Sequence, residues 1–204
     1  MATDTVKIYI IHGWDGSPEE PMLDWLKKSI QKTGVEVLSP HMPNPEKPTI
    51  TAWTSLLEEI VDDSRPCIFI GHSIGCQTIL RFIEKTKKCS RILGIVLIAP
   101  WMTLTEQTLI EKETRKIAEP WMEDPIDFEK VRTKVKAAVA IFSDNDPYIL
   151  LDQADLFKNE LGAKIIIEHN KYHFDPINKI DRLESALSEA LSLISRNKNW
   201  EKKL

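Results

Sequence analysis

The sequence predicts an α/β protein of three layers, α/β/α, in which a mostly parallel sheet of about six strands lies between helices. Along all 204 residues, short β-branched runs alternate with stretches that carry apolar residues at helical spacing. The most apolar run, residues 92–99, lacks the polar alternation of a strand with one face in water. Strands that alternate with helices form βαβ units, and these build parallel sheets covered on both faces.

Each predicted element follows from its own pattern. Strands are expected at residues 6–11, 35–38, 67–70, 92–99, 137–142 and 164–167, and helices near 23–32, 50–61, 77–83, 105–118, 150–161 and 180–195. We find no repeat or linker, so one domain over residues 1–204 is expected. A strand order of 2-1-3-4-5-6 would place the change of direction between the first and third strands, where ligands bind in open α/β sheets.

Composition excludes several function classes. The net charge of −4 argues against a nucleic-acid surface, because phosphate binding needs a concentrated basic face. The chain has three cysteines, and Cys67 and Cys76 fall on predicted core elements, so we expect buried thiols rather than a disulfide framework. The first residues lack the pattern of a signal peptide, and no apolar run reaches transmembrane length. A cytoplasmic protein without a membrane span is expected.

The most informative motif is Gly-His-Ser-Ile-Gly at residues 71–75, a G-x-S-x-G between an apolar strand and a helix. Strand, sharp turn and helix in this order are typical of a nucleophile elbow, with Ser73 at the turn. Glycines two residues before and after the serine relieve the clashes that such a turn creates. The alternative is a strand-to-helix turn that merely requires small residues.

A serine nucleophile needs an imidazole base, and the imidazole needs a carboxylate that orients it. Asp144 and Asp146 follow the fifth predicted strand, and His169 and His173 follow the sixth. We favour Asp146, because it lies farther out on its loop before a proline, and Asp144 is the alternative. His173 is favoured over His169, which is still adjacent to its strand. The order Ser, Asp, His is that of α/β-hydrolases.

An oxyanion hole needs two backbone N–H groups directed at the developing negative oxygen. Ile74, directly after the nucleophile, is predicted to supply one, and Trp14, on the loop after the first strand, the other. Asp15 beside it would oppose an oxyanion, so it either points away or takes part in substrate selection. His12 on the same loop is interpreted as structural.

Residues 101–136 are too long for a single crossover, and the segment 101–125 carries apolar doublets near both ends. We interpret 101–125 as a small cap over a pocket, with Trp14, Trp101, Met102 and Trp121 as candidate pocket residues; an ordinary long crossover is the alternative. The chain has no phosphate-binding glycine loop and no metal-ligand spacing of histidines. Neither a cofactor nor a metal is therefore expected.

Residues 71–75, 143–148 and 172–174, with the chain length and the loop after the first strand, resemble the small serine hydrolases of the retinoblastoma-binding protein nine and YdeN-like family. The similarity covers nearly the whole chain. It implies a trimmed α/β-hydrolase fold with Ser73, Asp146 and His173 as triad. Trp14 departs from the small residues expected at its position.

The leading hypothesis is a serine hydrolase, a carboxylesterase that forms an acyl-enzyme on Ser73 with a small ester or acyl substrate. The alternative is a protein-interaction module that retains the hydrolase fold with weak or no catalysis. The chain gives no indication of a protein partner, and ester, amide and thioester hydrolysis use the same triad.

Overall fold

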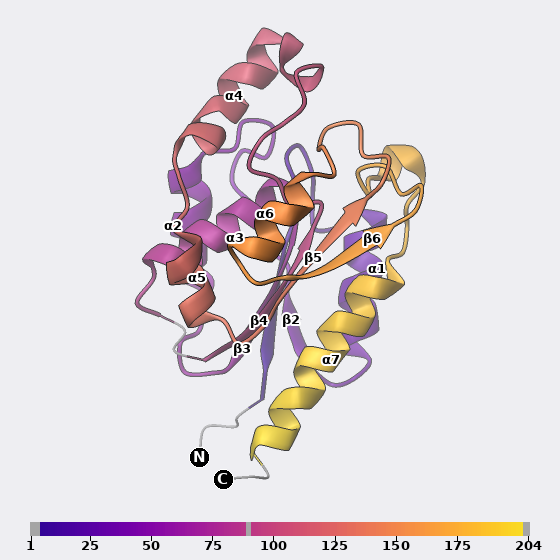
Figure 1. Ribbon diagram of the computed structural model, residues 1–204. Coiled ribbons are helices and arrows are strands. Elements are labelled where there is room, and N and C mark those ends of the chain that lie inside the picture. Colours follow the sequence, from indigo (N-terminus) through magenta and orange to yellow (C-terminus); the bar gives the residue numbers. More distant parts are fainter. Residues whose placement is uncertain (1–4, 89–90, 202–204) are drawn as a thin grey trace.

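The computed structural model describes residues 5–88 and 91–201 (Figure 1). In this part of the chain, six strands form one parallel sheet of order β2-β1-β3-β4-β5-β6. The strands are β1 (Lys7–Ile11), β2 (Glu36–Leu38), β3 (Cys67–His72), β4 (Ile92–Ile98), β5 (Ala138–Ser143) and β6 (Lys164–Glu168). The predicted strand order and the α/β class are confirmed.

Helices cover both faces of the sheet, which confirms the three-layer architecture (Figure 1). The α-helices are α1 (Pro21–Gln31), α2 (Ile50–Ile60), α3 (Ile74–Lys85), α4 (Lys112–Glu123), α5 (Phe128–Lys134), α6 (Gln153–Asn159) and α7 (Glu184–Glu201). Helices α1 and α7 pack together on one face, and α2, α3 and α5 pack on the other. Short 3₁₀ helices lie at η1 (Thr108–Ile110) and η2 (Pro176–Asn178).

The core sits around the two central strands. Every residue of β3 and of β4 is buried, as the unbroken apolar run 92–99 predicts. Cys67 and Cys76 are both buried, as predicted. No helix within the described ranges is long and apolar enough to cross a bilayer.

The segment between β4 and β5 differs from its prediction. The expected helix at 105–118 is replaced by η1 and by α4, which begins at Lys112 and continues through Pro120. Helix α5 was not predicted, although Asp127 caps it by accepting a hydrogen bond from the N–H of Lys130 (3.0 Å). The last helix begins at Glu184 rather than near residue 180.

Tertiary contacts hold the end of α4, beyond Pro120, against α2 and α3. The ring of Trp121 is fully buried and stacks edge-on against Trp53 of α2. Arg81 of α3 donates hydrogen bonds to the carbonyls of Trp121 (2.8 Å) and Asp124 (2.7 Å), and to the Asp124 carboxylate (2.7 Å). These contacts satisfy carbonyls at the end of α4 that its own backbone leaves open.

Candidate active site

Ser73 occupies the sharp turn between β3 and α3, with φ 53° and ψ −122°. A non-glycine residue rarely adopts this conformation, and its neighbours must leave room for it. A Cβ on Gly75 would lie 2.5 Å from the Ile11 carbonyl oxygen, and one on Gly71 would lie 2.8 Å from the Cys76 nitrogen. Both glycines of the motif are therefore required for packing at the elbow.

Asp146 and His173 meet from the loops that follow β5 and β6. Asp146 Oδ2 lies 2.7 Å from His173 Nδ1, and both side chains are largely buried. Asp146 Oδ1 accepts hydrogen bonds from the backbone N–H groups of Tyr148 (2.9 Å) and Ile149 (3.2 Å), so the carboxylate is held in orientation. The Tyr148 ring packs edge-on against the imidazole, with the two ring centroids 5.0 Å apart.

Asp144 contacts the other histidine, His169, through Oδ2 and Nδ1. Asp144 Oδ1 also accepts a hydrogen bond from the backbone N–H of Asn170 (2.9 Å). The Asn170 and His169 contacts hold the pKa of the Asp144 carboxyl below its ordinary value. Asp144 thus ties the loop after β5 to the loop after β6, at a place outside the cavity that Ser73 lines.

Two further residues strengthen this tie between the loops, and sequence reasoning missed both. Ser143 Oγ accepts a hydrogen bond from the Lys171 N–H (3.0 Å), and Asn145 Oδ1 accepts one from the Tyr172 N–H (2.8 Å). The Ser143 hydroxyl donates to Asn145 Oδ1 (2.8 Å), which orients the amide. The signal was present in the sequence, since Ser, Asp and Asn after a strand commonly hydrogen-bond loop backbone.

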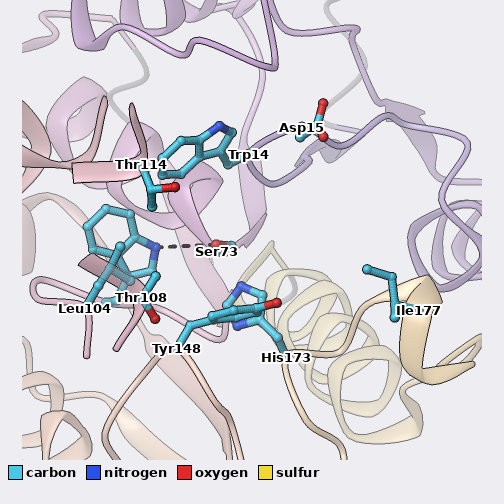
Figure 2. Close-up of a pocket in the computed structure, with 10 residues that line it drawn as sticks. Trp14, Asp15, Ser73, Leu104, Thr108, Thr114, Tyr148, His173 and Ile177 are labelled. Carbon is cyan, nitrogen blue, oxygen red and sulfur yellow. Dashed lines mark hydrogen bonds between the residues drawn. The ribbon is translucent and has the colours of Figure 1, made fainter. Parts of the chain in front are cut away.

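The predicted oxyanion donors are the backbone N–H groups of Ile74, the first residue of α3, and of Trp14, on the loop after β1. Within the described residues, neither the Ile74 N–H nor the Trp14 N–H has a hydrogen-bond partner. Gly13 brings the first-strand loop against the elbow, because a Cβ there would lie 3.3 Å from Ser73 Cβ. The carboxylate of Asp15 is directed away from Ser73 (Figure 2).

The Trp14 loop is fixed to the proline-rich loop. The Trp14 indole N–H donates to the Glu46 carbonyl (3.1 Å), and the Asp15 N–H donates to the Pro45 carbonyl (2.7 Å). His12 Nδ1–H donates to the Gly13 carbonyl (2.8 Å), and its Nε2 accepts from the Met42 N–H (2.9 Å). Burial lowers the pKa of His12, which suits a neutral imidazole that joins two loops.

Ser73 opens onto a cavity of about 320 Å³ (Figure 2). Its lining is mostly apolar and aromatic: Trp14, Asp15, Ser73, Trp101, Leu104, Thr108, Thr114, Tyr148, His173 and Ile177. Ser73 and His173 therefore share one cavity, with the predicted pocket residues Trp14 and Trp101.

The other two candidate pocket residues lie elsewhere. Met102 is half-buried and does not line this cavity. Trp121 lines a separate cavity between α4 and the start of α2, because its ring turns toward Trp53 and its indole N–H donates to the Pro48 carbonyl (3.2 Å). For these two residues the expected placement is wrong.

The hydroxyl of Ser73 accepts a hydrogen bond from the indole N–H of Trp101, at 3.4 Å from Nε1 (dashed line in Figure 2). Among the described residues, no hydrogen bond joins Ser73 Oγ to the His173 ring. Catalytic hydrogen bonds are often long or poorly aligned in unliganded structures and tighten around a substrate. The observation that relates Ser73 to His173 is therefore that both residues line the same cavity.

The segment 101–125 is attached to the rest of the fold at both ends. At its start, Gln153 Oε1 accepts hydrogen bonds from the N–H groups of Met102 (2.8 Å) and Thr103 (3.0 Å), and Gln153 Nε2 donates to the Thr103 carbonyl (2.7 Å). At its end, the buried Arg81 holds Asp124. Between these attachments, the segment contributes Trp101, Leu104, Thr108 and Thr114 to the cavity wall.

Comparisons with known proteins show the family of the chain. A family model described as serine hydrolase matches residues 8–189. YdeN of Bacillus subtilis (strain 168) is 25% identical over 173 residues, which cover 83% of this chain and 86% of YdeN. The serine hydrolase RBBP9 of Rattus norvegicus is 22% identical over 165 residues, which cover 80% of this chain and 78% of RBBP9.

Solved structures share the fold. The crystal structure of the ydeN gene product from Bacillus subtilis matches with a TM-score of 0.82 at 24% identity, over 94% of this chain and 100% of that one. Est1E from Butyrivibrio proteoclasticus, with ferulic acid bound, matches with a TM-score of 0.72 at 14% identity, over 95% and 92%. The expected α/β-hydrolase fold and the resemblance are confirmed: the chain belongs to the serine hydrolase family.

Proposed function

We propose that this protein hydrolyses small carboxylic esters through an acyl-enzyme intermediate on Ser73. The observation that carries the proposal is the buried contact of 2.7 Å between Asp146 and His173, together with the cavity that His173 shares with the strained Ser73. A serine hydroxyl is a weak nucleophile at neutral pH, so a positioned base is the requirement that this pair would meet.

In the first step, neutral His173 takes the proton of Ser73 while Oγ attacks the ester carbonyl carbon. His173 Nδ1–H donates to Asp146, which leaves Nε2 unprotonated and available as the base. The carboxylate then stabilises the imidazolium that forms. Its other oxygen is occupied by two backbone amides, so it keeps its orientation during the reaction.

The attacked carbonyl oxygen becomes an oxyanion, which needs donors that are not otherwise engaged. The N–H groups of Ile74 and Trp14 are the two candidates beside Ser73. Ile74 is also the first residue of α3, where the helix dipole favours negative charge. Removal of one such donor typically costs about 10²- to 10³-fold in kcat.

Collapse of the tetrahedral intermediate breaks the bond to the alcohol, which leaves with the proton held on His173. A water molecule then gives its proton to His173 and attacks the acyl carbon. The second collapse releases the carboxylic acid and returns the proton to Ser73. The two half-reactions together consume one water and regenerate the hydroxyl.

The cavity favours small, apolar substrates. Its volume of about 320 Å³ is near the lower end of ordinary ligand pockets. Trp14, Trp101 and Tyr148 supply aromatic surface, and Leu104 and Ile177 supply aliphatic surface. We propose that the segment 101–125 acts as a cap which limits the length of the acyl or alcohol group.

The test is covalent labelling with an active-site-directed fluorophosphonate, followed by an acyl-length series of chromogenic esters. We expect labelling on Ser73, loss of labelling and turnover in Ser73→Ala, and a preference for short acyl chains. A folded wild-type protein that is neither labelled nor active at neutral pH would contradict the proposal and favour the interaction module.

A further inference from the structure

His72 is the last residue of β3 and directly precedes the nucleophile, yet the proposed chemistry gives it no role. Its side chain is buried, with 3% of the residue exposed, and it does not line the cavity that Ser73 lines. A buried imidazole carries a desolvation cost unless its polar atoms find partners. Its contacts therefore need an explanation.

The contacts of His72 go to the loop of the proposed base. His72 Nε2 lies 2.8 Å from the backbone carbonyl oxygen of His173, and because that oxygen can only accept, Nε2 carries the proton. The two imidazole rings also pack against each other, with centroids 5.2 Å apart and planes tilted by 45°. His72 thus contacts both the ring and the backbone of His173.

The protonation state of His72 follows from its surroundings. Burial and, to a smaller extent, the neighbouring His173 together lower the pKa of this imidazole to about 3, so the ring is neutral at ordinary pH. With the proton on Nε2, Nδ1 is a bare acceptor that has no hydrogen-bond partner among the described residues. Glu20 Oε2 lies 3.9 Å from Nδ1, and burial raises the pKa of the Glu20 carboxyl.

The loop of His173 needs external support. Asn170, Tyr172 and Phe174 all have positive φ, between 49° and 57°, which costs energy for residues with a side chain. Side chains of the loop after β5 hold the N–H groups of residues 170, 171 and 172 from one side. From the other side, His72 holds the carbonyl of His173 itself.

We propose that His72 is a positioning residue, which through its hydrogen bond to the His173 carbonyl sets where the His173 imidazole stands relative to Ser73. The inference rests on the proposed function, because it concerns the same base and nucleophile. His72 is covalently adjacent to Ser73, so the bond ties the base directly to the elbow. A displacement of about 1 Å between reacting groups can cost 10²-fold in rate.

Two substitutions separate the hydrogen bond from the space that the ring fills. In His72→Phe, the ring remains and the donor is lost. In His72→Gln, the amide nitrogen takes the place of Nε2 and the donor remains. We expect His72→Phe to lower kcat by roughly 10- to 100-fold with KM within about twofold, since His72 lies outside the cavity. His72→Gln is expected to retain kcat within about threefold.

The assay includes wild type, Ser73→Ala, fluorophosphonate labelling rates and the melting temperature of each variant. Wild-type kcat in a folded His72→Phe, or equal losses in His72→Phe and His72→Gln, would overturn the role of the hydrogen bond while leaving the proposed function intact. A wild-type protein that lacks Ser73-dependent turnover and labelling overturns the proposed function itself.

A measurement on the wild-type protein covers the case in which His72→Phe does not fold. Nitrogen-15 NMR of the imidazoles should show His72 as the neutral Nε2–H tautomer throughout pH 5 to 8. A Nδ1–H tautomer would overturn the proposal, because the His173 carbonyl would then have no donor from His72.

Discussion

The loops after β5 and β6 carry two aspartate–histidine pairs that differ in their surroundings. Asp146 and His173 have side chains that are 3% and 11% exposed, whereas Asp144 and His169 are 30% and 81% exposed. His173 of the first pair lines the cavity of Ser73, whereas neither Asp144 nor His169 lines it. An aspartate beside a histidine is therefore not enough to identify a catalytic pair.

The difference lies in what each pair can do with its charge. Burial removes water that would screen the Asp146–His173 contact, so the carboxylate can stabilise an imidazolium effectively. The exposed pair is screened by water, and exposed ion pairs contribute little. Asp144 instead uses its other oxygen to hold the backbone of the His173 loop. We infer that the outer pair supports the inner one.

The largest expected effect separates the two histidines. His173→Gln should lower kcat by roughly 10⁴-fold or more, because the base is lost, while the matched control His169→Gln should stay within about threefold. Steady-state kinetics with a short-chain chromogenic ester measure both. Equal losses of kcat in His173→Gln and His169→Gln would contradict the distinction between the two aspartate–histidine pairs.

Substitutions of the two aspartates should also differ strongly in their effect on kcat. Asp146→Asn keeps the shape of the carboxyl but disturbs the tautomer and removes the charge, so we expect kcat to fall roughly 10³- to 10⁴-fold. Asp144→Asn should cost less than about tenfold in kcat. If the order of the two losses were reversed, Asp144 would be the carboxylate of the triad.

A smaller effect is expected from the contacts that join the two loops. Asn145→Ala removes the acceptor for the Tyr172 N–H and the partner of the Ser143 hydroxyl, and should lower the free energy of unfolding by about 1–2 kcal/mol. Asn159→Ala, on the exposed face of α6, is the matched control and should change it by less than about 0.5 kcal/mol. Chemical denaturation measures the free energy of unfolding of both variants. Equal values for Asn145→Ala and Asn159→Ala would show that the contacts of Asn145 do not contribute to stability.

The smallest effect concerns pH. Because the folded-state pKa of Asp144 lies below its ordinary value of 3.8, its contribution to stability is present above that value and is lost as pH falls through the folded pKa. Thermal melts of wild type and Asp144→Asn from pH 6 to pH 3 should converge at the acid end. A constant difference over the whole range would exclude a role for the Asp144 charge.

The sequence predicted the parts of the molecule that depend on local pattern. The six strands followed from apolar runs, and the sharp turn at Ser73 followed from the glycine spacing around it. The choice of Asp146 and His173 rested on distance from the strand ends, and these two side chains contact each other in the fold. The roles of these residues remain a proposal that kinetics must test.

The features that were missed depend on tertiary contacts. The sequence predicts Trp121 as a pocket residue. In the fold, its carbonyl accepts a hydrogen bond from the buried Arg81 and its ring packs against Trp53, so it lines a different cavity from Ser73. Gln153 fixes the start of the segment 101–125 from some fifty residues away in the chain. Nothing in its motif assigns a role to His72, and only the fold brings it to the His173 carbonyl. Contacts between distant segments leave no local signal in a single sequence.

The central claim is that Ser73, the Asp146–His173 pair and the N–H groups of Ile74 and Trp14 form one catalytic site. A crystal structure of the fluorophosphonate adduct tests it most directly. We expect phosphorus bonded to Ser73 Oγ, the phosphonyl oxygen within hydrogen-bond distance of both N–H groups, and His173 Nε2 directed at Oγ with the Asp146 contact retained. An adduct on another residue, or a phosphonyl oxygen directed away from both N–H groups, would contradict the claim.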